Sequence, residues 1–262
     1  TVQQGAAVKL IMLGSGTSTG VPRIGNDWGD CDPAEPRNRR TRASIIVESA
    51  AGNRLLVDTS TDCRAQLLAN DIDRIDGVFW THDHADHCHG IDDLRPFRYG
   101  RAGPIPGYAV DETARRLRQR FGYVFAGQEG YPTICTIDTL DRLRMIAGFG
   151  VDWCQMAHGP GETTAYRFEA DGKSIGYATD FSAISDEMID LFYNVDILVS
   201  DCLRREPHPT HAHLGMAIEL GERCRAGRVV LSHLDKSMDY RVLCDEVPDF
   251  VTVGYDGLEM IA

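Results

Sequence analysis

Short runs of β-branched and other apolar residues, bounded by turn residues, recur along most of the chain. Runs of this length and composition favour β-strands, because strands need few residues and accommodate branched side chains well. The expected strands are Val8–Leu13, Ser44–Glu48, Arg54–Val57, Gly77–Trp80, Gly107–Val110, Val151–Ala157, Thr164–Glu169, Ser174–Ala178, Asp196–Val199 and Arg228–Leu231. Asp171 and Gly172 lie between two of these strands and predict a hairpin turn.

Longer segments with helical periodicity alternate with the later strands, and several open on a Ser, Thr or Asp suited to capping a helix. The expected helices are Thr61–Asn70, Asp111–Arg120, Ser185–Tyr193, Leu214–Arg225 and Lys236–Glu246. Strands dominate the first part of the chain and helices mix in afterwards. This order predicts an α+β fold of two facing mixed sheets with outer helices, a four-layer αββα sandwich. No Pro- or Gly-rich linker divides the sequence, so residues 1–262 are expected to form a single domain.

Composition narrows the possible classes of protein. The 262 residues are 43% hydrophobic and 25% charged, which is typical of globular proteins and excludes disordered, collagen-like and coiled-coil chains. The apolar run Val8–Leu13 is far shorter than the roughly 20 residues of a membrane span, so no membrane partner is expected. A net charge of −12 makes binding to a large nucleic acid unfavourable. The eight scattered cysteines form no CxxC pair and predict reduced thiols in a cytoplasmic protein.

Histidines gather directly after the expected strand Gly77–Trp80, where four of the nine fall within eight residues. His82 and His84 are two apart in extended chain, so their side chains share one side. Asp86 and His87 follow where the chain can turn into a helix. Such a segment offers two imidazoles to one cation, and a carboxylate and an imidazole to a second. This donor set suits zinc or manganese, with iron as an alternative.

Three further candidate ligands, His158, Asp180 and His233, each come at or just after the end of an expected strand. If those strands lie side by side, their ends form one rim, where loops usually carry function. Nitrogen and oxygen ligands in this number fit two divalent metal ions with a carboxylate between them. The full candidate set is His82, His84, Asp86, His87, His158, Asp180 and His233. The alternative is a histidine-rich surface tract or an adventitious metal site.

The neighbours of these residues predict supporting roles. Asp83 points opposite to the flanking histidines, and His89 is expected to face a helix rather than a metal. The last three histidines, His208, His211 and His213, precede the expected helix Leu214–Arg225. A histidine can protonate a leaving group at neutral pH, so at least one of the three is predicted to act in catalysis or substrate binding. The alternative is a polar loop that only starts the helix.

Two glycine- and arginine-rich segments are candidates for binding anions. Backbone amides around Gly16–Thr19, with Thr17 and Ser18, could hold a phosphate oxygen. The long segment Gly20–Arg42 contains Arg37, Arg39, Arg40 and Arg42, which form either a solvated charge run or a loop that faces an anion.

The pattern His82-x-His84-x-Asp86-His87 resembles that of the metallo-β-lactamase superfamily of hydrolases, and His158, Asp180 and His233 match its later ligands in order. The resemblance implies the four-layer αββα metallo-β-lactamase fold. It places His82, His84 and His158 on one metal. It places Asp86, His87 and His233 on the other, with Asp180 bridging, and it gives Asp86 a part in catalysis as well.

Finer likeness comes from the segments Leu13–Pro22 and Gly90–Arg95. They resemble the subgroup that contains the phosphoribosyl cyclic phosphodiesterase of the carbon–phosphorus lyase pathway, with transfer-RNA 3′-processing endonucleases as neighbours. The resemblance implies a phosphodiesterase acting on a small cyclic ribose- or nucleotide-type substrate, and a possible homodimer. It makes His211 the proton donor, with His213 as the alternative. Candidate substrate contacts are Thr17, Ser18, Arg95 and His208.

Two departures from the subgroup change the expectation. Its cyclic phosphodiesterase carries a Cys-x-Cys-x-x-Cys structural zinc site, whose positions here read Asn26, Trp28 and Cys31, with Lys236 as the further ligand position. No structural zinc is therefore expected. The endonucleases have a long arm that holds transfer RNA, whereas the segment Gly100–Gly150 is short. Its aromatic residues Phe121, Tyr123, Phe125 and Tyr131 are expected to pack in the core or at a rim, with a stacking wall as the alternative.

Other activities remain open on the same ligands. Acyl, thioester or lactone hydrolysis would use the same two metals, and the ligands alone do not separate it from phosphodiester hydrolysis. The transfer-RNA endonuclease is a further alternative, which the acidic charge disfavours. Di-iron redox chemistry and a non-catalytic nucleotide-binding module are two more.

Overall fold

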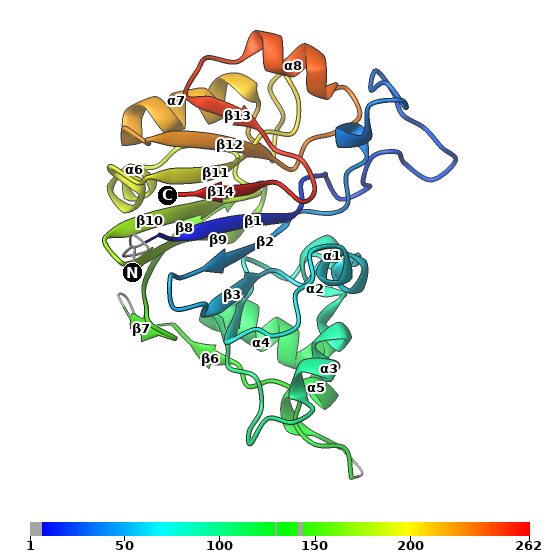
Figure 1. Cartoon of the computed structure of the whole chain (residues 1–262), viewed down its shortest axis with the longest axis vertical. Helices are drawn as coiled ribbons and strands as arrows, with labels where there is room; N and C mark the ends of the chain where they lie inside the picture. The colour runs from blue at the N-terminus through cyan, green and yellow to red at the C-terminus, as the bar shows by residue number, and fades with distance from the viewer. Residues whose placement is uncertain (1–6, 129, 141–143) are drawn as a thin grey trace, which may run out of the picture.

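The computed structural model describes residues 7–128, 130–140 and 144–262, which form two mixed seven-stranded sheets with helices outside them (Figure 1). In the first sheet, β14, β1, β2 and β3 are antiparallel, and β3, β4, β5 and β6 are parallel. Its strands in spatial order are β14 (Glu259–Ile261), β1 (Lys9–Gly14), β2 (Ser44–Glu48), β3 (Arg54–Val57), β4 (Gly77–Phe79), β5 (Gly107–Ala109) and β6 (Asp138–Thr139).

In the second sheet, β13, β12, β11 and β10 are parallel, and β10, β9, β8 and β7 are antiparallel. Its strands in spatial order are β13 (Val251–Val253), β12 (Arg228–Ser232), β11 (Ile197–Asp201), β10 (Lys173–Ala178), β9 (Gly161–Ala170), β8 (Phe149–His158) and β7 (Arg144–Ile146). Strands β8 and β9 form a long hairpin in which His158 pairs with Gly161 at the turn.

Helices cover the outer face of each sheet, which confirms the expected four layers. Those on the first sheet are α1 (Cys63–Ala69), α2 (Ala85–Cys88), η2 (Ile91–Leu94), α3 (Arg95–Arg98), α4 (Asp111–Arg120) and α5 (Gly122–Ala126). Those on the second sheet are α6 (Asp186–Phe192), α7 (Leu214–Cys224) and α8 (Tyr240–Glu246), and η1 (Pro36–Asn38) lies in the long loop after β1.

The alternation of side chains along β1 explains why the sheets stack. Leu10 and Met12 pack into the core between the two sheets. Ile11 and Leu13 point the other way and pack under the helices of the first sheet. Successive strand residues point to opposite faces, so a strand that is apolar on both faces must be covered on both. This double burial produces the sandwich.

Every expected strand is present, and most differences lie at element ends. Asp171 and Gly172 have φ of 56° and 73° and join β9 to β10 as the predicted hairpin turn. The helix expected from Lys236 begins only at Tyr240, because Asp239 caps it by accepting hydrogen bonds from the backbone N–H groups of Arg241 and Val242 at 3.0 and 3.1 Å.

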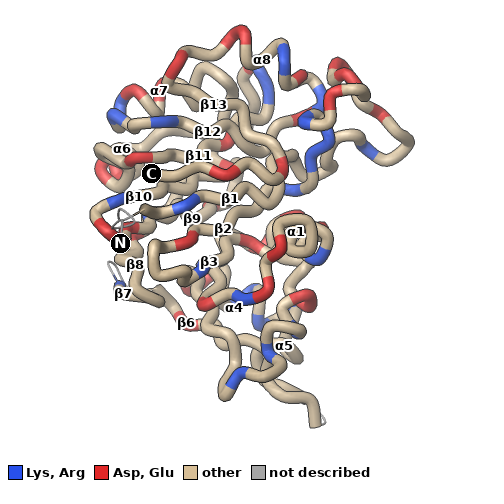
Figure 2. The backbone as a smooth tube through the Cα atoms, viewed as in Figure 1, with Lys and Arg blue, Asp and Glu red and all other residues tan. Residues whose placement is uncertain are grey.

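Three general properties complete the description. Lys and Arg are interspersed with Asp and Glu along much of the backbone (Figure 2). None of the helices in the described part of the chain has the length and hydropathy of a membrane span. The eight cysteine thiols are free, and all except Cys244 are buried.

Candidate metal centre

The candidate ligands come from the carboxyl ends of strands in both sheets. His82 and His84 follow β4, and Asp86 and His87 lie on the short helix α2. His158 ends β8, while Asp180 and His233 follow β10 and β12. The predicted rim is therefore present, and strand ends from both sheets contribute to it.

Three aspartate and histidine residues at this rim have left-handed backbone conformations. The φ angles are 63° for Asp58, 57° for Asp180 and 59° for His233. A residue other than glycine in this region costs about 1–3 kcal/mol, and such residues concentrate at functional sites. The local turns therefore indicate that the surrounding structure fixes these side chains in place.

The carboxylate of Asp180 lies between two pairs of imidazoles. Its Oδ2 is 3.8 Å from Nε2 of His82 and 3.8 Å from Nε2 of His158. Its Oδ1 is 3.3 Å from Nε2 of His87 and 3.5 Å from Nε2 of His233. Each oxygen thus faces a different pair of nitrogen donors, which is the arrangement that a carboxylate needs to bridge two cations.

Asp86 and His84 complete the two groups. Asp86 Oδ2 is 3.3 Å from Nε2 of His87 and 3.6 Å from Nε2 of His233. His84 is exposed, and one of its ring nitrogens lies within 4.8 Å of the donor atoms of His82, His158 and Asp180. All candidate ligands are therefore brought together, in the two groups that the resemblance implies.

Hydrogen bonds to Nδ1 fix how the imidazoles point. His158 Nδ1 lies 2.7 Å from the Thr210 carbonyl oxygen, which can only accept, so Nδ1 carries the proton. His87 Nδ1 lies 2.7 Å from Asp58 Oδ2 and donates in the same way. Both rings therefore turn an Nε2 lone pair toward Asp180, as ligating histidines do when a second group holds the other nitrogen.

Asp58 orients His82 as well, through one intervening hydroxyl. Thr81 Oγ1 donates to Asp58 Oδ2 at 2.9 Å, and Asp58 Oδ1 accepts the Thr81 backbone N–H at 2.8 Å. Because the Thr81 hydroxyl proton is used in this bond, its oxygen accepts from His82 Nδ1 at 3.0 Å. Asp58 was not predicted from the sequence. Its signal is a buried aspartate directly after an apolar strand, as at Asp180.

The inward-facing nitrogens have no other partner. Among the described residues, the buried Nε2 atoms of His82, His87 and His233 make no hydrogen bond. A buried polar atom without a partner costs about 1–3 kcal/mol, so the cluster of three is unfavourable by itself. Imidazole and carboxylate donors suit zinc, manganese and iron. The residues present therefore fit a pair of divalent cations.

The pKa shifts of the clustered residues also favour a site for cations. Burial opposes a charge on His233, but the carboxylates of Asp180 and Asp86 outweigh it and raise the pKa of His233 to about 9. Burial disfavours the charged form of Asp180, yet His233 and His87 hold its pKa well below the usual value. Burial and His87 together lower the pKa of His82 well below the usual range. The buried carboxylates therefore demand positive charge at this point.

His211 lies at the edge of the cluster. Its Nδ1 is 3.1 Å from Asp201 Oδ2, and its ring stacks on that of His233 with centroids 4.8 Å apart. Asp201 ends β11, is fully buried, and accepts the backbone N–H groups of Phe181 and Ala212 at 3.2 Å each. Sequence reasoning missed Asp201, although it lies at the carboxyl end of a buried strand.

His208 and His213 make local hydrogen bonds instead. His213 caps α7, because its Nδ1 accepts the backbone N–H of Met216 at 3.3 Å. His208 accepts a hydrogen bond from the backbone N–H of Thr210 at 3.3 Å, and its ring centroid lies 5.3 Å from that of His211. Of the three, His211 is the one that lines the cavity over the ligands.

A cavity of about 870 Å³ opens above the cluster. Ser18 lines it, whereas Thr17 is 5% exposed and donates its backbone N–H to the Leu234 carbonyl at 3.2 Å. Asp83 is buried, pairs with Arg116 and Arg120, and lines the same cavity as the candidate ligands.

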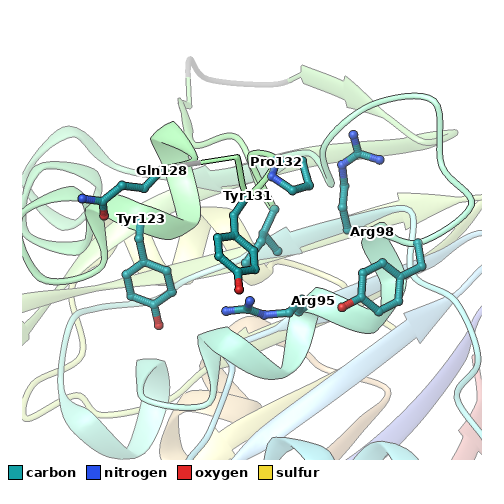
Figure 3. Close-up of a pocket in the computed structure, with 8 residues that line it drawn as sticks. Arg95, Arg98, Tyr123, Gln128, Tyr131 and Pro132 are labelled. Atoms are coloured by element: carbon teal, nitrogen blue, oxygen red, sulfur yellow. The ribbon is translucent and has the colours of Figure 1, made fainter.

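Arg95 lies elsewhere and does not line this cavity. It lies on α3, where Asp92 holds its Nη2 at 2.7 Å. Together with Tyr123 and Tyr131 it lines a separate pocket of about 310 Å³ (Figure 3). Phe121 and Phe125 pack, as expected, against the hydrophobic core between the first sheet and its helices. The rings of His89 and Phe121 meet edge to face, with centroids 5.7 Å apart.

Of the four arginines in the loop after β1, Arg37 and Arg39 are exposed, Arg42 is partly exposed and Arg40 is buried, and none of them lines the cavity. Arg40 is buried and donates to the Met238 carbonyl at 2.7 Å and to Asn38 Oδ1 at 3.3 Å. Trp28 Nε1 donates to Asn26 Oδ1 at 3.0 Å. Asn26 and Trp28, which stand at positions of the subgroup's structural zinc ligands, are thus hydrogen-bonded to each other.

Comparison with known proteins gives the site a family context. Residues 53–234 match the family described as "Beta-lactamase superfamily domain". Among solved structures, the chain is similar to a new diphosphatase from the PhnP family. The two share 33% identity and a TM-score of 0.88, over 98% of this chain and 97% of that one.

Curated relatives carry different names. The chain is 32% identical over 261 residues to an octanoyltransferase of Porphyromonas gingivalis (strain ATCC BAA-308 / W83), a match that covers 97% of this chain and 51% of that protein. It is 23% identical over 159 residues to the exodeoxyribonuclease YycJ of Bacillus anthracis, covering 55% of this chain and 56% of that protein. The chain thus spans about half the length of the curated relatives it matches.

Proposed function

The chain belongs to the metallo-β-lactamase superfamily, and from that premise we propose that it is a metal-dependent phosphodiesterase. The observation that carries the proposal is the division of the Asp180 carboxylate between two pairs of imidazole nitrogens at 3.3–3.8 Å. The substrate class we propose is a small cyclic or linear ribose- or nucleotide-type phosphodiester. Similarity over nearly the whole chain to a PhnP-family diphosphatase supports chemistry at phosphorus.

Two divalent cations, zinc or manganese with iron as an alternative, would be held by the seven candidate ligands. When bound, they would supply Lewis acidity toward the phosphate and a water of lowered pKa. Asp86 presents one oxygen to His87 and His233. We assign Asp86 a second role as hydrogen-bond acceptor for the attacking water.

His211 is the proton donor in this proposal. Its Nδ1–H donates to Asp201, so the acid is the doubly protonated imidazolium, whose Nε2–H can pass to the departing oxygen. Asp201 acts as a positioning residue, because it accepts the His211 Nδ1–H and two backbone N–H groups at once. An alkoxide is a poor leaving group, and a donor at this position would lower the barrier to its departure.

Acyl, thioester or lactone hydrolysis is the second candidate, and the name of the Porphyromonas gingivalis relative favours it. That protein is about twice as long as the matched region, so its acyl chemistry need not reside in the part that resembles this chain. A carbonyl substrate would use the same candidate metal ligands. Its leaving group would be a thiolate or an alkoxide, and these differ in how much they need a proton from His211.

A paired assay on protein of measured metal content tests the proposal. Protein loaded with Mn²⁺ or Zn²⁺ is given bis-p-nitrophenyl phosphate, a set of nucleoside cyclic phosphates, and an octanoyl thioester. We expect turnover of phosphodiesters only. Asp180→Ala should lower turnover by about 100-fold or more and lower the metal content, since it removes the group shared by both sites.

The matched control is Asp190→Ala, which removes an exposed carboxylate on α6 and should change neither quantity. Preferential hydrolysis of the thioester would contradict the phosphodiesterase assignment. Full turnover by Asp180→Ala protein would remove the bridging role of that residue.

A further inference from the structure

A second pocket is lined by residues of α3, of α5 and of the segment that follows α5 (Figure 3). Its volume is about 310 Å³, and it shares no lining residue with the cavity above the candidate metal ligands. Sites for small molecules usually measure about 300–1,000 Å³, so a pocket of this size fits one small ligand. The proposed hydrolysis leaves this pocket without a role.

Three tyrosine rings gather at the second pocket. Tyr99 and Tyr131 are 70% and 69% exposed, and Tyr123 is 41% exposed. Figure 3 shows the Tyr131 hydroxyl directed toward Arg95, whose guanidinium carbon lies 5.9 Å from the Tyr131 ring centroid. Exposed aromatic rings offer flat faces on which the ring of a ligand can stack, as nucleic-acid bases do on aromatic side chains.

The wall of the second pocket is positively charged. Arg95 and Arg98 line it, and among the described residues no Asp or Glu does. Arg98 donates from Nε to the Thr133 carbonyl at 3.1 Å and from Nη1 to the Arg101 carbonyl at 2.7 Å. These bonds hold the guanidinium in place, but no carboxylate in the described part of the chain pairs with it. The charge of Arg98 is therefore not compensated locally.

Arg95 also keeps donors free. Asp92 accepts from its Nη2 at 2.7 Å and does not itself line the pocket. The other nitrogens of the Arg95 guanidinium make no hydrogen bond within the described residues. Even when Asp92 is counted, the two arginines of the lining leave one positive charge beside the tyrosine rings.

We propose that this second pocket binds a nucleoside monophosphate, with the base stacked on tyrosine and the phosphate held by arginine. The inference does not depend on the proposed hydrolysis and adds a separate binding site to it. Arginine suits this task because its planar fork matches phosphate oxygens. The net charge of −12 disfavours a polynucleotide, whereas a single nucleotide responds mainly to the charges nearest to it.

Calorimetric titration of the full chain with adenosine 5′-monophosphate (AMP) tests the proposal. We expect AMP to bind both metal-loaded protein and protein treated with EDTA, because no candidate metal ligand lines the pocket. Adenosine lacks the phosphate and should bind about tenfold more weakly, since hydrogen bonds between charged groups are the strong ones. Ribose 5-phosphate lacks the base and should bind at least about fivefold more weakly than AMP.

Substitutions in the second pocket should weaken binding of AMP to EDTA-treated protein. We expect Tyr131→Ala and Arg95→Gln each to lower the affinity about fivefold or more. Tyr131→Phe keeps the ring and should bind as the wild-type protein does. This variant shows whether the loss in Tyr131→Ala protein comes from the missing ring.

A second arginine–tyrosine contact provides the matched controls. Arg225 lies over the exposed ring of Tyr193, with its guanidinium carbon 5.7 Å from the ring centroid, and neither residue lines the pocket. Arg225→Gln and Tyr193→Ala should therefore leave the affinity for AMP unchanged. Melting temperatures of all variants, measured in parallel, show whether each protein is folded.

Three results would overturn the inference. The first is loss of all AMP binding after EDTA treatment, which would place the nucleotide at the metal ligands. The second is equal affinity for AMP and ribose 5-phosphate, and the third is equal effects of the pocket variants and the controls. Binding and not turnover is measured, so failure of the proposed hydrolysis would leave this result intact.

Discussion

A few buried aspartates outside the ligand set determine how the histidines are presented. Asp58 holds His87 directly and His82 through Thr81, and Asp201 holds His211. Each is completely buried and accepts backbone N–H groups as well, so its position is fixed by the fold. The chemistry of the ligands therefore depends on carboxylates that would never contact a metal.

The late histidines give a residue-scale prediction. Replacing His211 by Ala should lower kcat about 100-fold for a phosphodiester with an alkyl leaving group, and less than about tenfold for one that releases p-nitrophenolate. The reason is that general-acid catalysis contributes about 10²–10⁴ where the leaving group is a strong base, and little where it is a weak one. Kinetics on the two substrates check the prediction.

His213→Ala provides the comparison. It removes the side chain that caps α7, so it should lower the melting temperature while leaving the ratio between the two leaving groups unchanged. Equal losses on both substrates in His211→Ala protein would remove the proton-donor role from His211.

At the scale of elements, the loop between β1 and β2 is fixed by a buried arginine. Arg40 is 2% exposed and donates to the carbonyl oxygens of Asp235 and Met238, which precede α8, and to Asn38 within the loop. The exposed Arg39 instead lies over the ring of Trp28, with its guanidinium carbon 5.0 Å from the ring centroid. The loop is thereby joined to the start of α8.

Arg40→Met should therefore destabilise the protein strongly. The substitution keeps the length of the side chain but leaves buried carbonyl groups without a donor, so we expect the free energy of unfolding to fall by about 2–4 kcal/mol. Urea denaturation followed by circular dichroism measures the change. Arg39→Met should cost less than about 1 kcal/mol, because it removes only an exposed cation–aromatic contact. Equal effects of the two changes would show that burial of Arg40 is not what fixes the loop.

The sequence predicted regular elements and local motifs well, and long-range pairings poorly. All strands of four or more residues were predicted, as were the three-residue strands β4 and β5, whereas β6, β7, β13 and β14, with two or three residues each, were missed. The candidate metal ligands were identified because four of them lie close together in the sequence. Asp256 shows why other residues were missed.

Asp256 accepts hydrogen bonds from the hydroxyl and backbone N–H of Ser15, 241 positions away, and from the same groups of Thr41. Nothing near it in the sequence indicates this role. Arg95 is the converse case, since the resemblance of the segment Gly90–Arg95 to the subgroup made it a candidate substrate contact, while in the structure it lines a different pocket.

At the scale of the whole molecule, the candidate metal centre joins the two sheets. His82, His84, Asp86 and His87 follow a strand of the first sheet, and the remaining candidate ligands follow strands of the second. Ions bound here would add attractive interactions across the sandwich and neutralise the buried carboxylates. Folded protein would bind them, and unfolded chain would bind them far more weakly.

Removal of metal should therefore lower the thermal stability. By linkage, a ligand present at 100 times its dissociation constant stabilises the folded state by about 2.7 kcal/mol, so the melting temperature should fall by several degrees after chelation. Calorimetry of protein before and after treatment with EDTA checks this. Asp180→Ala protein should show a much smaller change. Identical melting curves for treated and untreated wild-type protein would contradict the presence of bound ions.

The β9–β10 turn at Asp171 and Gly172 divides the candidate ligands unevenly. A chain cut there would leave five of them on the amino-terminal fragment, and Asp180 and His233 on the carboxyl-terminal one. The amino-terminal fragment would lack Asp180, the carboxylate that lies between the imidazoles, and the carboxyl-terminal fragment would lack four of the histidines. Catalysis would return only when the two pieces reassociate, which makes this turn a natural place to split the protein into a complementation reporter.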